Sequence, residues 1–308
     1  VLQLPQVVVV GQQSHGKSTA LEMLAGLNFL PRGGGVVTTR PFQITIHHNV
    51  STSMPYGIVS EGNSASYPRS EVRFEGTEYA QDLKTKLEAL NPRDHISKEA
   101  ATVKLYNAGA GPNITLIDLP GYTFGHPKDR EARQKVEALM DEYCSMRSTI
   151  ILLVHDCSND FANNPVQAMI KERYDPDFTR TFGVMTKMNL DFCYKTTDVN
   201  YKDRAESVMK ILSNEKNSPF SFPTYGWVGI TGQNPKEMIT ESVQQTRDKE
   251  RAFFDGPEFM LAAGGDHIAR LPRDSDGRWP LGTDILRERI GKALKAVSYT
   301  HLRAHETH

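Results

Sequence analysis

The chain has 308 residues, enough for one large α/β domain or for one domain with an appendage. A formal net charge of -1 with 24% charged residues gives no basic field, so we expect no nucleic-acid partner. The three cysteines show neither metal-ligand spacing nor a disulfide framework, which favours a reducing, cytoplasmic compartment. No apolar stretch approaches the roughly 20 residues of a membrane-spanning helix, and no signal peptide is recognisable.

The first predicted element is an apolar strand of four valines, which runs directly into a glycine-containing loop. Residues 11–18, GQQSHGKS, fit the phosphate-binding pattern G-x-x-x-x-G-K-[ST]. Gly11 and Gly16 let the backbone bend closely around a polyphosphate with its N–H groups turned towards the anion. Lys17 would reach the β- and γ-phosphates, and the Ser18 hydroxyl would bind Mg²⁺. A chance match is the alternative, but the strand before the loop and the helix-forming residues after it argue against one.

A glycine-rich segment follows at residues 30–41, LPRGGGVVTTRP, and leads into an alternating strand at residues 42–46. Three consecutive glycines disfavour regular structure, so the sequence predicts a mobile loop. Thr38 in this loop can bind Mg²⁺ through its hydroxyl when the γ-phosphate is present, as a nucleotide-sensing switch does. An ordinary glycine loop is the alternative interpretation.

The next part of the chain contains a loop, a helix and two strands. Residues 50–70 are rich in Ser, Gly and Asn and are expected to form a surface loop. Residues 77–90 have the apolar spacing of an amphipathic helix. Strands are predicted at residues 102–106 and 114–117, the second of which is strongly apolar.

A D-x-x-G pattern stands at the end of that apolar strand. Asp118 can hold Mg²⁺ through a water molecule, and the N–H of Gly121 can turn towards the γ-phosphate. The pattern is common on its own. It gains weight here because it follows a phosphate-binding loop, the threonine at position 38 and a buried strand.

Helices and strands continue to alternate towards the middle of the chain. A helix is predicted at residues 129–146, an apolar strand at 149–154, a polar loop at 155–164, a helix at 165–174 and a strand at 181–185. This alternation predicts an α/β protein with a doubly wound, mainly parallel sheet flanked by helices, the three-layer P-loop NTPase fold. Ligands bind at the carboxyl ends of the strands in such sheets. Gly11, Asp118 and Thr186 each follow a strand at that end.

Together these motifs resemble the GTPase domain of the dynamin superfamily. The segments that carry the resemblance are LPQVVVVGQQSHGKST, LPRGGGVVTTRP, ITLIDLPG, SNDFANN and TFGVMTK. It extends from Leu4 to about residue 297 and implies Mg²⁺-dependent binding and hydrolysis of GTP by a fragment of a larger protein. In the whole protein it implies assembly on and remodelling of membranes, with self-association across the nucleotide face and contact with microtubules among the expected partners. A cytoplasmic protein peripherally associated with membranes is therefore expected.

The resemblance also divides the chain. Residues 1–280 would form the dynamin-type GTPase domain, and residues 281–297 would begin the helix that signals to the stalk. Residues 298–308 interrupt the helical pattern and resemble translated adapter sequence, so we expect a non-native tail. A metal-binding tail is the alternative, since this stretch contains several histidines.

The resemblance assigns catalytic roles that the motifs alone do not. Many small GTPases place a water-orienting glutamine directly after D-x-x-G, where this chain has Tyr122. Dynamins use a phosphate-loop glutamine, which corresponds to Gln13. In place of an arginine finger, the family holds a monovalent cation, Na⁺ or K⁺, at positions that correspond to Ser14, Gly33 and Gly35. Such a cation would neutralise charge that develops on the transferring phosphoryl group.

Face-to-face pairing of two such domains is a further implication of the resemblance. An aspartate of the loop after the strand at residues 149–154 reaches the partner's site in the family, and Asp160 occupies that position. An ordinary surface turn residue is the alternative for Asp160.

Base recognition departs from the family pattern at two positions. The usual motif is T-K-x-D, but this chain has Asn189, whose carboxamide offers one acceptor oxygen for the two N–H groups of guanine. An unpaired buried donor costs on the order of 1–3 kcal/mol, so we expect a weakened guanine preference, with Lys187 stacked on the base. Gly232 stands where an asparagine is usual, within residues 226–234. Asp191 is a candidate substitute for the missing carboxylate.

These considerations give one set of expected site residues. The nucleotide-binding residues are Gly11, Gln13, Ser14, His15, Gly16, Lys17, Ser18, Thr19, Asp118, Gly121, Thr186, Lys187, Asn189, Gly232 and Gln233, and those with catalytic roles are Gln13, Ser14, Lys17, Thr38 and Gly121. A nucleotide-gated interaction module that hydrolyses poorly is the alternative from another functional class. An ATPase on the same scaffold is a third possibility.

Overall fold

A large central sheet organises the chain in the computed structural model, which describes residues 5–31, 38–47, 54–61, 71–92, 94–106, 113–122, 130–189, 199–216, 218–232 and 242–306. The strands are β1 (Gln6–Val10), β2 (Phe42–His47), β3 (Tyr56–Glu61), β4 (Val72–Glu75), β5 (Ala101–Tyr106), β6 (Ile114–Asp118), β7 (Thr149–Asp156), β8 (Thr181–Thr186) and β9 (Trp227–Gly229). They form one sheet in the order β4-β3-β5-β2-β6-β1-β7-β8-β9.

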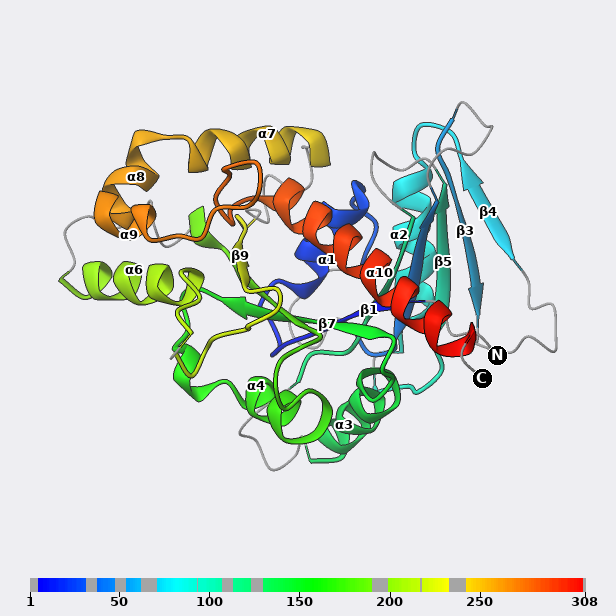
Figure 1. The fold of residues 1–308 in the computed structure, drawn as a ribbon. Coiled ribbons are helices and arrows are strands. Elements are labelled where there is room, and N and C mark those ends of the chain that lie inside the picture. Colours follow the sequence, from blue (N-terminus) through cyan, green and yellow to red (C-terminus); the bar gives the residue numbers. More distant parts are fainter. Residues whose placement is uncertain are drawn as a thin grey trace.

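Helices connect these strands and cover the sheet (Figure 1). They are α1 (Lys17–Ala25), α2 (Tyr79–Leu90), α3 (Arg130–Cys144), α4 (Pro165–Met169), α6 (Val199–Leu212), α7 (Val243–Phe254), α8 (Pro257–Ala263), α9 (Gly265–Ala269) and α10 (Thr283–Glu306). A 3-10 turn, η2 (Phe161–Asn163), precedes α4, and a π-helical turn, η3 (Ile170–Tyr174), follows it. Of the helices in the described part of the chain, none combines the length and the apolar character that crossing a bilayer requires.

Strand pairing confirms the predicted mainly parallel sheet. Strand β1 pairs in parallel with β6 and β7, and β8 pairs in parallel with β7 and β9. The carboxyl ends of β6, β1, β7 and β8 therefore lie at the same edge. Strand β2 is antiparallel to β6 and parallel to β5, and β3 and β4 extend that side with antiparallel pairs. The three-layer α/β fold expected from the sequence is thus present.

The four valines of β1 are buried on both faces of the sheet. Val8 and Val10 belong to a buried cluster with residues of α3, α4 and α6. Val7 and Val9 belong to a second cluster with residues of α1, α2 and α10. Figure 1 shows α3 and α4 on one side of the sheet and α1 and α10 on the other. A strand covered on both faces has no solvent-facing positions for polar residues.

The predicted surface loop at residues 50–70 is wrong where the structure describes it. Residues 56–61 form β3, which pairs with β5 in register from Tyr56 opposite Tyr106. The two rings stack with centroids 4.5 Å apart, and Val59 is fully buried. Neighbouring glycine and serine residues obscured this strand in the sequence, and its pairing partner lies more than forty positions further along the chain.

Helix α10 extends beyond the end that the sequence pattern predicted. It runs without interruption from Thr283 to Glu306, across residue 297, where the sequence pattern predicted an interruption. Leu286, Ile290 and Leu294 lie on its buried side, in the same cluster as α1. The division into residues 1–280, 281–297 and 298–308 remains a prediction.

Candidate nucleotide-binding site

The loop after β1 has the backbone geometry that the phosphate-binding pattern requires. Gly16 adopts φ 89° and ψ 20° at the start of α1, a left-handed conformation that favours glycine. A Cβ at Gly16 would lie 3.2 Å from Thr186 Oγ1, and one at Gly11 would lie 2.5 Å from the carbonyl oxygen of Val154. Both glycines are therefore needed for close approach to neighbouring strands. Ser18 and Thr19 lie in the first turn of α1.

The carboxyl end of β8 fastens this loop. The Thr186 hydroxyl donates to the carbonyl of His15 at 2.7 Å. Lys187, which has φ 61°, donates through Nζ to the carbonyl of Ser14 at 2.9 Å and forms an ion pair with Asp156. The structure thus brings Thr186, the last residue of β8, and Lys187 next to it to the phosphate-binding loop, as their place at the carboxyl end of a strand led us to expect.

Three predicted phosphate and metal residues meet beside the loop. Thr38 Oγ1 donates to Asp118 Oδ2 at 3.3 Å, and Asp118 is the last residue of β6, opposite Val9 of β1. Lys17 Nζ donates to the carbonyl of Gln12 at 3.0 Å. Burial lowers the pKa of Lys17 to about 8, and the nearby charge of Asp118 limits this fall. Burial raises the pKa of Asp118 to about 7, and the charge of Lys17 and the hydrogen bond from Thr38 limit this rise.

The residues at this corner fit a magnesium ion. Asp118 Oδ1 is buried and finds no hydrogen-bond partner within the described ranges. A buried carboxylate oxygen without a donor is costly, and a cation would satisfy it. Thr38 lies beside this carboxylate and Ser18 lies in the first turn of α1, and their hydroxyls would add oxygen ligands of the kind that Mg²⁺ prefers.

The D-x-x-G segment runs alongside the phosphate-binding loop. The Tyr122 N–H donates to the carbonyl of Gly11 at 3.2 Å, and the Gln13 N–H donates to the carbonyl of Tyr122 at 3.1 Å. A Cβ at Gly121 would lie 2.9 Å from Lys17 Nζ and 2.9 Å from Gln13 Cα. Only glycine permits this approach, which places the Gly121 backbone next to the lysine that is expected to bind phosphate.

Tyr122 itself is directed away from this corner. Its side chain is buried, and its hydroxyl donates to Glu137 Oε1 on α3 at 2.9 Å. The residue after D-x-x-G therefore has a packing role in this chain.

His15 of the phosphate-binding loop contacts His155 near the carboxyl end of β7 and Asn159 in the loop that follows, contacts that sequence reasoning missed. The rings of His15 and His155 pack edge to face with centroids 5.1 Å apart. Asn159 Nδ2 lies 3.4 Å from His15 Nε2, and Asn164 Nδ2 lies 3.1 Å from His155 Nδ1. Burial, followed by the influence of His155, lowers the pKa of His15 to about 4. The two histidines are 140 positions apart, so only the fold could reveal the pair.

The two segments expected to contact the base also lie together. The Gly232 N–H donates to Asn189 Oδ1 at 2.7 Å, and Asn189 Nδ2 donates to the carbonyl of Gly232 at 3.0 Å. A Cβ at Gly232 would lie 3.0 Å from Lys187 Cγ, so the asparagine that is usual there would require a shift. Gln233 and Asp191 lie outside the described residues.

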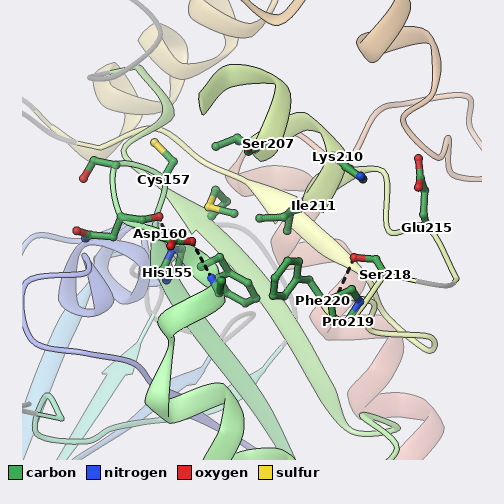
Figure 2. A pocket seen from close by; sticks show the side chains of 16 residues that line it. His155, Cys157, Asp160, Ser207, Lys210, Ile211, Glu215, Ser218, Pro219 and Phe220 are labelled. Carbon is green, nitrogen blue, oxygen red and sulfur yellow. Dashed lines mark hydrogen bonds between the residues drawn. The ribbon is translucent and has the colours of Figure 1, made fainter. Parts of the chain in front are cut away.

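Asp160 lies at the surface on the loop that follows β7. Its Oδ1 accepts the N–H of Ala162 at 3.0 Å and caps the turn η2. Beside this loop is a cavity of about 700 Å³ between the loop, α6 and the turn at Pro219. Figure 2 shows His155, Cys157 and Asp160 on one side of the cavity and Ser207, Lys210 and Ile211 on another. The predicted cation ligands Gly33 and Gly35 lie outside the described residues, whereas Ser14 is exposed on the phosphate-binding loop.

Comparison with known proteins agrees with this geometry. A family model for the dynamin family matches residues 7–188. The chain is similar to Dynamin-A of Dictyostelium discoideum, with 30% identity over 82% of this chain and 28% of that protein. It is also similar to the mitochondrial dynamin-like GTPase msp1 of Schizosaccharomyces pombe, with 35% identity over 82% of this chain and 27% of the relative.

A mammalian relative shows the same pattern. Dynamin-1-like protein of Mus musculus is 33% identical over 88% of this chain and 36% of its own length. The chain thus spans between 27% and 36% of the length of these three relatives. The matched family region begins in β1 and ends just after β8, and so includes the phosphate-binding loop, Asp118 and Lys187. The chain therefore belongs to the dynamin family of GTPases.

Proposed function

We propose that this chain binds GTP with Mg²⁺ and cleaves the γ-phosphate by in-line attack of water. The observation that carries the proposal is the meeting of Lys17, Thr38, Asp118 and Gly121 beside one glycine loop. These residues come from three separate parts of the chain, since Asp118 and Gly121 share the D-x-x-G segment, and each offers what a bound nucleoside triphosphate requires at that place.

The residues would divide the work as follows. Lys17 would bring its charge to the β- and γ-phosphates, and the loop N–H groups with the start of α1 would hold the phosphate oxygens. Ser18, Thr38 and Asp118 would hold Mg²⁺, which when bound supplies charge neutralisation between the phosphates. The Gly121 N–H would donate to the γ-phosphate.

Gln13 is our candidate for orienting the attacking water. Its backbone is fixed by the hydrogen bond to the Tyr122 carbonyl, while the Tyr122 hydroxyl is engaged by Glu137. A monovalent cation held by Ser14 with Gly33 and Gly35 is proposed on family resemblance. Its test is a comparison of turnover in Na⁺, K⁺ and choline salts.

Base selection is proposed to be weaker than in a protein with the usual aspartate. Both polar atoms of the Asn189 carboxamide are hydrogen-bonded to the backbone of Gly232. A carboxamide also leaves one guanine donor unpaired. Loss of that bond is worth roughly ten- to a hundredfold in affinity.

The same observation favours one rival function. A chain with weakened base contacts would act as a nucleotide-gated interaction module, which binds the nucleotide and changes conformation but hydrolyses it slowly.

In the whole protein we propose self-association across the nucleotide face and coupling to membranes, with a cytoplasmic, peripherally membrane-associated location. Contact with microtubules rests on family resemblance alone.

Two measurements test these alternatives. Isothermal titration with GTP, XTP and ATP measures the base preference. A strict GTP preference would contradict the predicted weakening of guanine recognition by Asn189, and an ATP preference would indicate an ATPase.

Phosphate release measured against protein concentration distinguishes the GTPase from the interaction module. A rate per molecule that rises with concentration and falls in Gln13→Ala and Lys17→Ala supports the GTPase. Tight binding without phosphate release in any salt supports the interaction module.

A further inference from the structure

A buried carboxylate connects the base segment to helix α10. Glu250 on α7 is 3% exposed. Its Oε1 accepts the N–H of Thr231 at 3.0 Å, and its Oε2 accepts the N–H of Thr283 at 2.7 Å. The Thr231 hydroxyl lies 3.4 Å from the same Oε1. One side chain therefore holds backbone groups from two segments that are about fifty positions apart.

One of these N–H groups lies next to the segment expected to contact the base, and the other lies at the start of α10. Thr231 immediately precedes Gly232, which pairs through both backbone groups with the Asn189 carboxamide. Thr283 is the first residue of α10 and is fully buried, so its N–H is one of the helix-terminal donors that have no partner within the helix. Glu250 supplies the acceptor for that donor from a different helix.

The two segments are also paired next to the carboxylate. The Gly229 N–H donates to the carbonyl of Pro280 at 2.9 Å, and the Gly282 N–H donates to the carbonyl of Gly229 at 2.7 Å. Residues 280–282 thus add to the edge of β9. Glu250 bridges the residues that follow this paired stretch on each segment.

Burial of a carboxylate is unfavourable unless hydrogen bonds compensate for the lost water. Burial raises the pKa of Glu250, and the N–H groups of Thr283 and Thr231 oppose that rise. An apolar side chain at this position would avoid the desolvation cost but would leave both N–H groups buried and unpaired. The carboxylate is therefore suited to fixing two backbone segments at once.

We propose that Glu250 is a positioning residue for nucleobase recognition. By holding Thr231 it fixes Gly232, and through Gly232 it orients the Asn189 carboxamide towards the base. Because its second oxygen holds Thr283, the same carboxylate sets the base segment and the first turn of α10 relative to each other. This inference rests on the proposed nucleotide-binding function, since it assigns residues 231–232 and 189 to the base.

The test compares a ligand that has a base with one that does not. Binding of the fluorescent nucleotide mant-GTP is measured directly, and inorganic tripolyphosphate is measured by competition. We expect Glu250→Gln to weaken mant-GTP binding about tenfold, because its NH₂ group would face a backbone N–H donor. Affinity for tripolyphosphate should stay within about twofold. In the described part of the chain, the carboxylate of Glu250 accepts hydrogen bonds from Thr231 and Thr283 and not from the phosphate-binding loop.

Matched variants separate positioning from general damage. Asp248→Asn changes an exposed carboxylate on the same helix and should alter neither affinity. In the double variant Glu250→Gln with Asn189→Ala, the loss should be less than the sum of the single losses, because Glu250 acts through Asn189. Glu250→Asp, which is one methylene too short to hold both N–H groups, provides a second test with a retained charge and should show the same selective loss.

Several results would overturn the inference. Equal loss of mant-GTP and tripolyphosphate binding would indicate only structural damage, and additive losses in the double variant would mean that Glu250 acts independently of Asn189. Unchanged mant-GTP binding in a folded Glu250→Gln or Glu250→Asp protein would do the same. Failure of the unaltered chain to bind mant-GTP is a different result, since it would overturn the proposed function and with it the role of Glu250.

Discussion

At the scale of single residues, buried polar groups around the phosphate-binding loop are held by few but specific contacts. His15 is almost fully buried, packs against His155, and has an Nδ1 atom with no hydrogen-bond partner in the described ranges. The ring is therefore kept neutral at physiological pH. A neutral buried histidine stabilises the fold only while it remains unprotonated.

This gives a pH-dependent prediction. The folded-state pKa of His15, about 4, lies below the ordinary value of 6.5, so its stabilising contribution is complete above pH 6.5 and is lost as the pH falls towards 4. Between pH 7.5 and 5 we expect the unaltered chain to lose about 2 kcal/mol more of its free energy of unfolding than His15→Ser. Urea unfolding at both pH values measures this difference.

The matched control changes an exposed histidine. His95 has a side chain that is 54% exposed and forms a solvent-exposed ion pair with Asp94. His95→Ser should therefore change the acid-induced loss of stability by less than about 0.5 kcal/mol. If His15→Ser also kept the full acid-induced loss, the buried ring would not be its source.

A second residue-scale prediction separates Gln13 from Tyr122. We expect Gln13→Ala to lower the rate of GTP hydrolysis by about a hundredfold with little change in GTP affinity, as loss of a water-orienting group does. Tyr122→Phe removes the hydroxyl that donates to Glu137 and should leave the rate within about threefold. Single-turnover phosphate release with both variants provides the measurement. A larger loss of rate in Tyr122→Phe than in Gln13→Ala would reverse the assignment.

At the scale of elements, the helix that follows the phosphate-binding loop is held at its far end by helices from the end of the chain. Arg287 of α10 donates to the carbonyls of Leu24 at 2.8 Å and Met23 at 3.2 Å, in the last turn of α1. Arg247 of α7 also donates to the Met23 carbonyl. Cations at a helix C-terminus satisfy free carbonyls and complement the helix dipole.

We therefore expect Arg287→Ala to lower the free energy of unfolding by about 1–2 kcal/mol, because the Leu24 carbonyl loses its charged donor and the Met23 carbonyl keeps only Arg247. Lys295→Ala, at an exposed position of the same helix, should change stability by less than about 0.5 kcal/mol. Urea unfolding of the three proteins gives both values. Equal stability of Arg287→Ala and the unaltered chain would show that α10 does not support α1.

The elements also show what the sequence could and could not predict. The strands β1, β6, β7 and β8 were recognisable because burial on both faces demands continuous apolar runs. The motif residues at their carboxyl ends followed from the parallel order. Strand β3 was missed because its pairing and the Tyr56–Tyr106 stack come from a distant strand. The roles of His155 and Glu250 were hidden for the same reason, since their partners are far away in the chain.

Local geometry was also beyond the sequence pattern. The helix predicted at residues 165–174 begins as expected, with Asn164 Oδ1 accepting the N–H groups of Val166 and Gln167. It changes to a π-helical turn at Ile170, which apolar periodicity does not reveal. The Tyr174 hydroxyl donates to Asp141 on α3 at 2.6 Å, a tertiary contact at the end of that turn.

At the scale of the whole molecule, the proposed self-association across the nucleotide face would bring a second copy of the chain to the surface that carries Asp160. Asp160 caps η2 through a hydrogen bond to Ala162, and its carboxylate is exposed on the same loop that contacts His15 through Asn159. A partner bound across the nucleotide face would thus contact a loop that is itself in contact with the phosphate-binding loop.

Two substitutions distinguish a partner contact from a turn residue. Asp160→Asn keeps the acceptor that caps the turn but removes the charge, whereas Asp160→Ala removes both. If the carboxylate reaches the partner, both variants should lose the rise of GTP hydrolysis per molecule with protein concentration. Phosphate release across a concentration series measures this. Retained concentration dependence in Asp160→Asn, with loss in Asp160→Ala, would leave Asp160 as a turn residue only.

Lys17, Thr38 and Asp118 are proposed to form one site for a nucleotide phosphate and its metal. Isothermal titration of the chain with GTP, in Mg²⁺ and again in EDTA, tests it most directly. We predict binding in Mg²⁺ that weakens at least about tenfold in EDTA, and a similar loss in Mg²⁺ for Asp118→Asn. Binding of equal strength in all three titrations would contradict the account, because the three side chains would then not hold a metal-bound phosphate.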